Sequence, residues 1–461
     1  MHCNCRPRPR SRGLTLLVAA AVPIALAVSV AMAASAASVA VAQAPPPLLD
    51  ALDGGAESLP APLSAQAFTY AVLARNADLA AMRQAVVAAV AQIGPAGALE
   101  DPRMSVSAAP RTFDGVMGPS GDIEISQALP WWGTLAARKD VARAQAAAAG
   151  YDRDALRLRL TALARGAFSD WVYVRRALDI NSANQSVLGE LRSIARIRYT
   201  TGQAPQTDVL QADVERGLLK QQRLEWQRQR ALVQARMNAL LDRLPQAEIP
   251  PPAPLPATVT LQAEERLAQR ALAHPQLERL QADEQAAQAS ERLAKKERYP
   301  KFAVSAGYDN MWPDPAMRPM AGVSFSVPLD QGKYRDEIDA AHAQTRRAAS
   351  NLENETMKVL ADVASDYASV QESAQSLALY RDELVPLARA TLAVARTEYG
   401  SGRGGFLDVL TAEQHRLETE LGLARTQSEY FQRLAELEAA SGGNLLSNGS
   451  DESGAGPGVA Q

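Results

Sequence analysis

The feature that most constrains the fold is that the chain repeats its own pattern. Pro102 begins the segment Pro-Arg-Met-Ser-Val-Ser and Pro300 begins Pro-Lys-Phe-Ala-Val-Ser, an offset of 198 residues. The motif Tyr-x-x-Gly, followed after five residues by Asp-Val-Leu-x-Ala, starts at Tyr199 and again at Tyr399. Two further landmarks keep the order: Asn76 with His274, and Pro130 with Pro328. A period this long indicates a duplicated half rather than a short-repeat solenoid.

Each half follows one predicted plan of a helix, two strands and two long helices. A first helix over 64–93 ends at Gly94, Pro95 and Gly97. The segment 133–199 holds almost no helix breakers, and its 67 residues span roughly 100 Å at about 1.5 Å per residue. Further long helices are predicted over about 208–244, 333–399 and 408–440, with a kink at Pro386. The fold class is therefore mainly α with a small β part.

Composition suits closely packed helices better than a thick globular core. Hydrophobic residues make up 47% of the chain but aromatic residues only 5%, and alanine accounts for most of the difference. Alanine favours helix strongly and allows backbones to approach. One predicted helix carries a small, partly polar coiled-coil seam with a period near 3.5: Leu417, Leu421, Ala424, Ser428, Phe431 and Ala435.

The N-terminus reads as an export signal. Arginines precede an apolar run over 14–30, and Ala-x-Ala sites follow at Ala31/Ala33 and Ala40/Ala42. The alternative is an uncleaved anchor, because the run is long enough to span a membrane. Cys3 and Cys5 both precede the run, so the mature chain would lack disulfides, thiolate metal sites and a cysteine nucleophile. No later segment is expected to reach the length of a spanning apolar helix, so a membrane crossing would need strands.

These features divide the chain into six predicted parts. They are a signal peptide over 1–42, a disordered segment over 43–63, a first structural repeat over 64–244, a Pro-rich linker over 245–262, a second repeat over 263–440 and a disordered tail over 441–461.

Four short runs alternate apolar residues with small or polar ones. The first run carries Met104 and Val106 on one side, and the second opposes Ile123 and Ile125 to Asp122 and Glu124. The runs over 302–307 and 322–327 alternate in the same way. This pattern is typical of a membrane barrel whose lumen is wet, where Asp122 and Glu124 would face the lumen. A soluble sheet lying on helices also alternates and stays open as an alternative.

The number of strands predicts the oligomeric state. Four strands cannot close a barrel, and an open edge in lipid leaves unpaired backbone groups at a cost of several kcal/mol each. Two copies give eight strands, whose interior side chains nearly fill the barrel. Three copies give twelve strands and leave a pore, so a conduit requires a homotrimer.

Aromatic residues lie where the strands are expected to leave the membrane. Trp131 and Trp132 follow the second strand, and Tyr308 and Trp312 lie at the far end of the third. Trp and Tyr are enriched at membrane–water interfaces. Packing in a core is the competing interpretation.

Catalytic, metal and nucleic-acid sites are not predicted. The net charge of −3 argues against nucleic-acid binding. The four histidines are scattered, and Met311, Met317 and Met320 around Trp312 indicate a plain surface loop more than a soft-metal contact. The Gly-x-Gly-x-x-Gly at 400–405 follows a helix rather than a strand, so it is no dinucleotide fingerprint. We predict no enzymatic activity and no cofactor.

The doubled motif from Tyr199 and Tyr399 resembles that of the TolC family of outer-membrane efflux proteins, as do the Asn76/His274 pair and the Pro-ended strand Ala128-Leu129-Pro130. The resemblance covers about 64–442. It implies a trimer with a twelve-stranded barrel in the outer membrane of a Gram-negative bacterium and a long helical barrel in the periplasm. It also implies docking to a periplasmic adaptor (membrane fusion protein) and an inner-membrane pump of the RND type.

A shorter run of residues resembles one branch of that family. The residues Gln127 to Gly133 resemble the CzcC and CusC kind, which serves heavy-metal efflux. Many relatives in that branch carry a lipidated cysteine after the signal, and this chain does not. Multidrug efflux and type I secretion therefore stay open, as does a soluble periplasmic coiled-coil scaffold or adaptor.

In the architecture that the resemblance implies, both Tyr-x-x-Gly turns lie at the periplasmic tip. Gly202 and Gly402 permit the tight turn, and Arg403 could be presented to an adaptor. Asp208 and Asp408 would either cap the next helix, worth about 0.5–2 kcal/mol, or form a ring of acids that favours cations at a closed aperture. Thr411 stands where some relatives carry a further acid.

Overall fold

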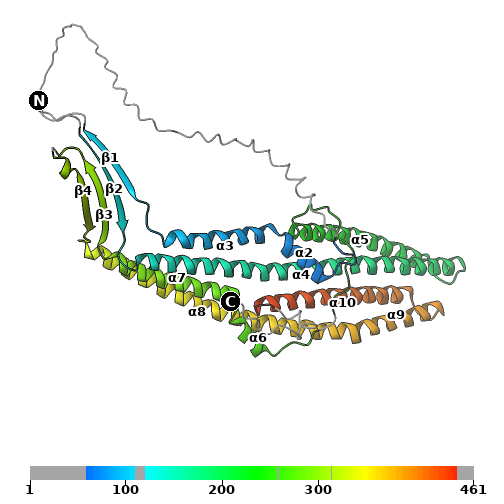
Figure 1. The fold of residues 1–461 in the computed structure, drawn as a ribbon. Coiled ribbons are helices and arrows are strands. Elements are labelled where there is room, and N and C mark those ends of the chain that lie inside the picture. The colour runs from blue at the N-terminus through cyan, green and yellow to red at the C-terminus, as the bar shows by residue number, and fades with distance from the viewer. Residues whose placement is uncertain (1–58, 110–119, 257–258, 313, 444–461) are drawn as a thin grey trace, which may run out of the picture. The chain divides into compact units, whose positions relative to one another are not determined.

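The computed structural model describes residues 59–109, 120–256, 259–312 and 314–443, all within one compact unit, Leu49–Gln461. The predicted signal peptide and most of the two predicted disordered segments lie outside these residues. The described part is mostly helical, with one small antiparallel sheet (Figure 1).

The predicted first helix is in fact two helices, α2 (Ala65–Arg75) and α3 (Ala77–Ala96). Asn76 separates them because its ψ of 122° is not helical. Its side-chain oxygen accepts a hydrogen bond from the Leu79 amide at 3.1 Å and so caps α3. An asparagine at a helix start competes with the helical backbone, which explains the break.

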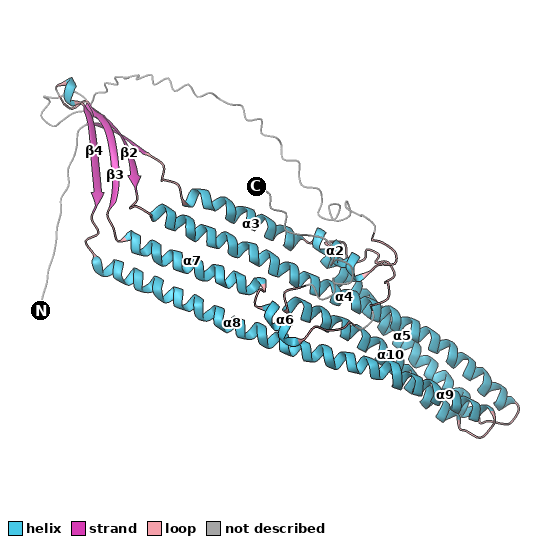
Figure 2. Ribbon diagram, turned by 60° about the horizontal axis from the view of Figure 1, so that its bottom comes forward, coloured by secondary structure: helices cyan, strands magenta, loops and turns pink. Residues whose placement is uncertain are grey.

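The long helices of the first half agree closely with the predicted ranges. α4 (Thr134–Thr200) has 67 residues, and α5 (Gln206–Leu240) follows after a short turn. α4 packs against α3, α5, α7 and α10, so it is the central helix of the described unit (Figure 2).

The second half runs through α6 (Glu264–Ala271), α7 (Pro275–Glu297), α8 (Gln331–Leu379), α9 (Val385–Gly400) and α10 (Phe406–Ala440). The predicted interruption near Pro386 is a π-helical turn over Tyr380–Leu384 between α8 and α9. Proline lacks an amide hydrogen and its ring clashes with the carbonyl four residues earlier, and a π turn relieves that clash.

The sheet consists of β1 (Arg103–Ala109), β2 (Ser120–Leu129), β3 (Lys301–Asp309) and β4 (Pro319–Ser326), in the order β1-β2-β3-β4. All three pairings are antiparallel. Val106 faces Ile123, Ile123 faces Tyr308, and Val304 faces Val323 across the ladders. Because paired residues share a face, the apolar sets of all four strands lie on one side of the sheet.

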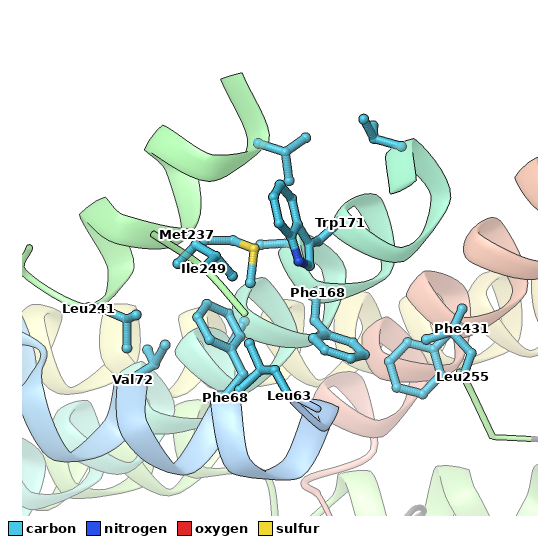
Figure 3. Close-up of a cluster of buried hydrophobic side chains, with 14 residues drawn as sticks. Leu63, Phe68, Val72, Phe168, Trp171, Met237, Leu241, Ile249, Leu255 and Phe431 are labelled. Atoms are coloured by element: carbon cyan, nitrogen blue, oxygen red, sulfur yellow. The ribbon is translucent and has the colours of Figure 1, made fainter. Parts of the chain in front are cut away.

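A buried cluster joins the first-half helices to the linker (Figure 3). Trp171 of α4 is fully buried there, and its indole nitrogen donates a hydrogen bond to the Pro250 carbonyl at 3.1 Å. Phe68 of α2, Phe168 of α4 and Met237 of α5 complete its centre. The linker is therefore packed onto the helices in an extended conformation.

Two predicted disordered segments are ordered where they meet the helices. Leu63 is completely buried and forms a parallel bridge with Pro252. At the other end, Ser441 is buried and the Gly443 carbonyl accepts a hydrogen bond from the Arg270 guanidinium. Both segments were predicted to be disordered up to the neighbouring helices, but the residues next to the helices are ordered. Local composition does not reveal the long-range contacts that order them.

The expectation that no later segment resembles a spanning helix was too strict. By length and composition, α3 is apolar enough to cross a membrane, and only 6% of that stretch is buried. The same criterion is met by core helices of soluble proteins, so it is weak evidence for a membrane helix.

Candidate functional site

The sheet exposes a broad apolar face. Ile123 and Ile125 of β2 are each 51% exposed, and Met104 of β1 is 70% exposed. Val323 and Phe325 extend the face onto β4. A contiguous apolar face over four strands marks a contact with lipid or with another protein.

The opposite face of the sheet is polar. Asp122 and Glu124 lie on it, paired in register with Ser107 and Ser105. The Ser107 hydroxyl donates a hydrogen bond to the Asp122 carboxylate. The two predicted lumen residues therefore share one hydrophilic face with small side chains, among them Ser126, Ser305 and Ser324.

Aromatic side chains lie at both ends of the sheet. The Trp131 ring stacks on Tyr299, with centroids 4.8 Å apart, and on Phe302 at 5.8 Å. Trp132 is exposed at the same end. Tyr308 and Trp312 are exposed at the other end of β3. Trp131 therefore packs in an aromatic cluster at the margin of the sheet.

The two Tyr-x-x-Gly turns share one geometry. Gly202 and Gly402 have φ angles of 71° and 76°, which favour glycine. The Gly202 amide donates to the Tyr199 carbonyl at 3.0 Å, and the Gly402 amide donates to the Tyr399 carbonyl at 3.1 Å. Each turn reverses the chain between two long helices, α4 to α5 and α9 to α10.

A buried contact joins the two turns. The Tyr399 hydroxyl donates a hydrogen bond to Asp208 Oδ2 at 3.0 Å. Tyr399 is 4% exposed and Asp208 is 9% exposed. The Arg198 guanidinium lies 4.5 Å from the centre of the Tyr399 ring and donates to the Tyr399 carbonyl. The end of α9 is therefore tied to the end of α4 and the start of α5.

The equivalent residues of the other half are not tied in this way. Tyr199 is 44% exposed. Asp408 accepts a hydrogen bond from the Gly405 amide at 3.0 Å and so caps its own helix. Pro205 stands where Gly405 stands in the other turn and has no amide hydrogen to offer Asp208. The carboxylate of Asp208 is thus left available to Tyr399.

Burial and the neighbouring carboxylate change the acidity of this tyrosine. Burial first, then the hydrogen bond to Asp208, raise the pKa of Tyr399 from 10.0 to about 12. The hydroxyl therefore remains a donor throughout the physiological range. Arg403 lies exposed in the same turn, where its guanidinium donates to the Ser401 hydroxyl at 3.2 Å.

The sequence matches a family model over most of its described length. The model for outer membrane efflux protein covers residues 69–242 and 267–443. The chain belongs to the outer membrane efflux protein family. This confirms the resemblance to TolC-type proteins, and the match excludes the N-terminal and C-terminal ends and the linker.

Solved structures of outer-membrane proteins share the fold of this family member. The channel OprN is 20% identical with a TM-score of 0.73, covering 82% of this chain and 90% of its own. CusC is 18% identical with a TM-score of 0.73, and the match covers 82% of this chain and 92% of the CusC chain. VceC from Vibrio cholerae is 19% identical with a TM-score of 0.69, and the match covers 82% of this chain and 96% of the VceC chain. No curated protein matches the sequence.

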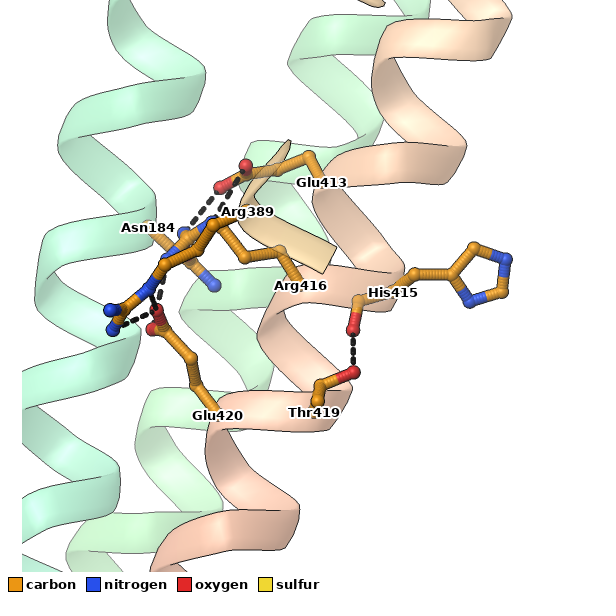
Figure 4. Close-up of polar contacts among 7 residues, drawn as sticks. All are labelled: Asn184, Arg389, Glu413, His415, Arg416, Thr419 and Glu420. Atoms are coloured by element: carbon orange, nitrogen blue, oxygen red, sulfur yellow. Dashed lines mark hydrogen bonds and ion pairs between the residues drawn. The ribbon is translucent and has the colours of Figure 1, made fainter. Parts of the chain in front are cut away.

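Sequence reasoning missed a charged network in this efflux protein. Arg416 of α10 pairs with Glu413 at 2.8 Å and with Glu420 at 2.8 Å, and it donates to the Asn184 side chain of α4 (Figure 4). Arg389 of α9 joins through Glu420 at 2.9 Å. The network joins three helices, α4, α9 and α10. Its i, i+3 and i, i+4 spacing on α10 was visible in the sequence, but its partners on other helices were not.

Arg198 was missed as well. The predicted tip residues were the two repeated motifs, and Arg198 precedes the first motif by one position. Its counterpart in the second half is Glu398, which has the opposite charge. A difference between two otherwise similar halves was the available signal.

Proposed function

We propose that the chain is one protomer of a homotrimeric duct across the outer membrane, in which three four-stranded sheets close one twelve-stranded barrel. The observation that carries this proposal is the register of the sheet, which gathers the large apolar residues of all four strands, except Met320, on one face. β1 and β4 are edge strands in the described sheet. Unpaired strand edges are not tolerated in lipid, so each edge requires a neighbouring copy.

Exposed apolar residues on the helices support the same assembly. Leu410 of α10 is buried in a cluster with Leu188 and Leu191 of α4. Its counterpart Leu210 on α5, an offset of 200 residues, is 56% exposed. Within one chain, α10 of the second half packs on α4 of the first half. If first and second halves alternate around a ring, the equivalent helix α5 packs on α9 of the next copy, and Leu210 becomes buried there.

The tip turns would form the periplasmic aperture of this duct. Asp208 and Asp408 of three copies would surround one opening, where carboxylates favour cations. The Tyr399–Asp208 hydrogen bond and the Arg198 contact would hold it closed. Gly202, Gly402, Tyr199 and exposed Arg403 would complete the turns that a periplasmic adaptor contacts, with an inner-membrane pump beyond it.

In the membrane, Asp122 and Glu124 would face the lumen, and Trp131, Trp132, Tyr308 and Trp312 would mark the two interfaces. The domain plan follows: an N-terminal signal over 1–42, two repeats over 64–244 and 263–440, and the linker between them.

Assembly can be tested on the mature protein purified from membranes. We expect a trimer that resists dissociation in detergent until heated, and channels in planar bilayers. A protein that stays monomeric and monodisperse in buffer without detergent would reject the barrel and the transport role together.

For the cargo, the phrase from Gln127 to Gly133 favours heavy-metal cations over drugs or secreted proteins. A chromosomal deletion should then raise sensitivity to copper, zinc or cobalt. Unchanged metal tolerance with increased drug sensitivity would assign the duct to multidrug efflux instead.

A further inference from the structure

An apolar cleft lies at the foot of the sheet, outside the tip and the polar face. Its volume is about 440 Å³. It lies between the ends of β2, β3 and β4 and the start of α4, and its walls are almost entirely hydrocarbon and aromatic: Leu129, Trp131, Trp132, Phe302, Val304 and Val323. An apolar cavity of ~150 Å³ already binds benzene, so this cleft is large enough for a stretch of acyl chain.

The cleft opens onto the face that meets lipid. Leu129, Phe302, Val304 and Val323 belong to the apolar side of the sheet through the β2–β3 and β3–β4 registers. The cleft is therefore continuous with the surface of Ile123 and Ile125. A void beside hydrocarbon loses dispersion contacts on its walls, so lipid fills it more favourably than water.

A cation lies beside the cleft at the helix side. Lys296, in the last turn of α7, places its ammonium 3.8 Å from the position that a side chain on Gly133 would occupy, and Gly133 lines the cleft. Within the described ranges, Lys296 forms no ion pair, whereas adjacent Lys295 pairs with Glu291 at 2.7 Å. Gly133 also leaves the start of α4 without a side-chain cap. This end of the cleft suits a phosphate.

We infer that the cleft is a binding site for one phospholipid per protomer, with an acyl chain between the aromatic residues and the sheet and the phosphate beside Lys296. The site rests on the proposed function, because that assembly places the apolar face in the membrane and the helix end of the sheet at its periplasmic leaflet. Trp131, which stacks on Tyr299 and Phe302, forms a rigid wall for the chain.

Native mass spectrometry of the purified trimer with added palmitoyl-oleoyl phosphatidylglycerol tests the inference. Val304→Trp fills the cleft and should lower retention of the lipid about tenfold. Val106→Trp is the matched control, because Val106 shares the apolar face but does not line the cleft. Lys296→Gln should also reduce retention, whereas Lys295→Gln should not.

The outcomes separate this site from the duct itself. Equal lipid retention by Val304→Trp and Val106→Trp would overturn the lipid site, and so would equal retention by Lys296→Gln and Lys295→Gln. If these variants still form conducting trimers, the proposed function is unaffected by that result. If Val304→Trp does not assemble, Val323→Trp from the other wall and the lysine pair decide the question. Loss of trimers in the unmodified protein would instead reject the proposed function.

Discussion

Tyr399 makes a buried side-chain hydrogen bond between the two Tyr-x-x-Gly turns, here called the tip turns. Tyr399→Phe keeps the ring against Phe406 and Arg198 but removes the hydrogen bond to the buried Asp208 carboxylate. A bond to a charged group contributes about 1.5–3 kcal/mol, so the closed state should lose about tenfold or more in population. Single-channel recording should show higher conductance. The control Tyr199→Phe, at the exposed counterpart, should behave as the unmodified protein.

The contact between Tyr399 and Asp208 should stop contributing to stability at high pH. Because the pKa of Tyr399 is raised to about 12 from 10.0, its contribution to stability is complete below pH 10 and is lost as pH rises toward 12. Conductance that rises between pH 7 and 9 would contradict a role for this hydroxyl in closure.

Arg416 neutralises two acids that are mostly buried. The side chain of Glu413 is 4% exposed, so Arg416→Met would leave a buried charge without its partner. Breaking such a pair costs about 3–5 kcal/mol, and we expect a clearly lower melting temperature by circular dichroism. Arg425→Met removes an exposed ion pair on the same helix and should change the melting temperature little.

Asp366 should have the opposite effect on stability. Burial first, then the charges of Glu436 and Asp362, raise the pKa of the Asp366 carboxyl from 3.8 to about 6. Its ionised form is therefore disfavoured in the fold, and Asp366→Asn should stabilise the protein at pH 7 by about 1 kcal/mol after allowance for solvent screening. The gain should shrink as the pH falls from about 6 and vanish by about pH 3, below the unfolded pKa of 3.8, where the carboxyl is protonated in both states. Asp382→Asn, which loses a partner in Arg381, should give no gain at either pH.

At the level of helices and strands, local pattern was a reliable guide and long-range contact was not. The absence of breakers located α4 to within a residue at each end, and alternation located all four strands. The break at Asn76 and the π turn before Pro386 depend on how one side chain competes with the backbone. The Tyr399–Asp208 contact joins residues 191 positions apart, which no periodicity encodes.

The exposed side of α3 provides a prediction for assembly. α7 packs on both α4 and α8, whereas its counterpart α3 packs closely on α4. In a ring, the free flank of α3, including exposed Ala88, would meet α8 of the next copy. Ala88→Arg should therefore abolish the heat-sensitive trimer on gels.

The control for that experiment is supplied by the chain itself. Val87 on the adjacent surface corresponds to Gln285 of α7, which is exposed. Val87→Gln should leave the trimer intact. An intact trimer with Ala88→Arg would mean that α3 does not form this interface.

At the scale of the assembled molecule, charge at the aperture should govern selectivity. Each copy brings Asp208 and Asp408 to its tip turns, and three copies would place these acids around one opening. Asp208→Asn combined with Asp408→Asn should lower the preference for cations, measured as the reversal potential in a salt gradient across a planar bilayer. An unchanged reversal potential would restrict Asp408 to helix capping and Asp208 to the Tyr399 contact.

The two turns use the same acid in two different ways. Both carry an aspartate at the equivalent position, and they differ three positions earlier, at Pro205 and Gly405. The Gly405 amide donates to Asp408, which therefore caps its own helix. Pro205 has no amide hydrogen, and Asp208 instead accepts a hydrogen bond from Tyr399 in the other turn. The tertiary link between the turns therefore depends on a main-chain N–H that Pro205 lacks, and it uses no functional group that the other turn does not also carry.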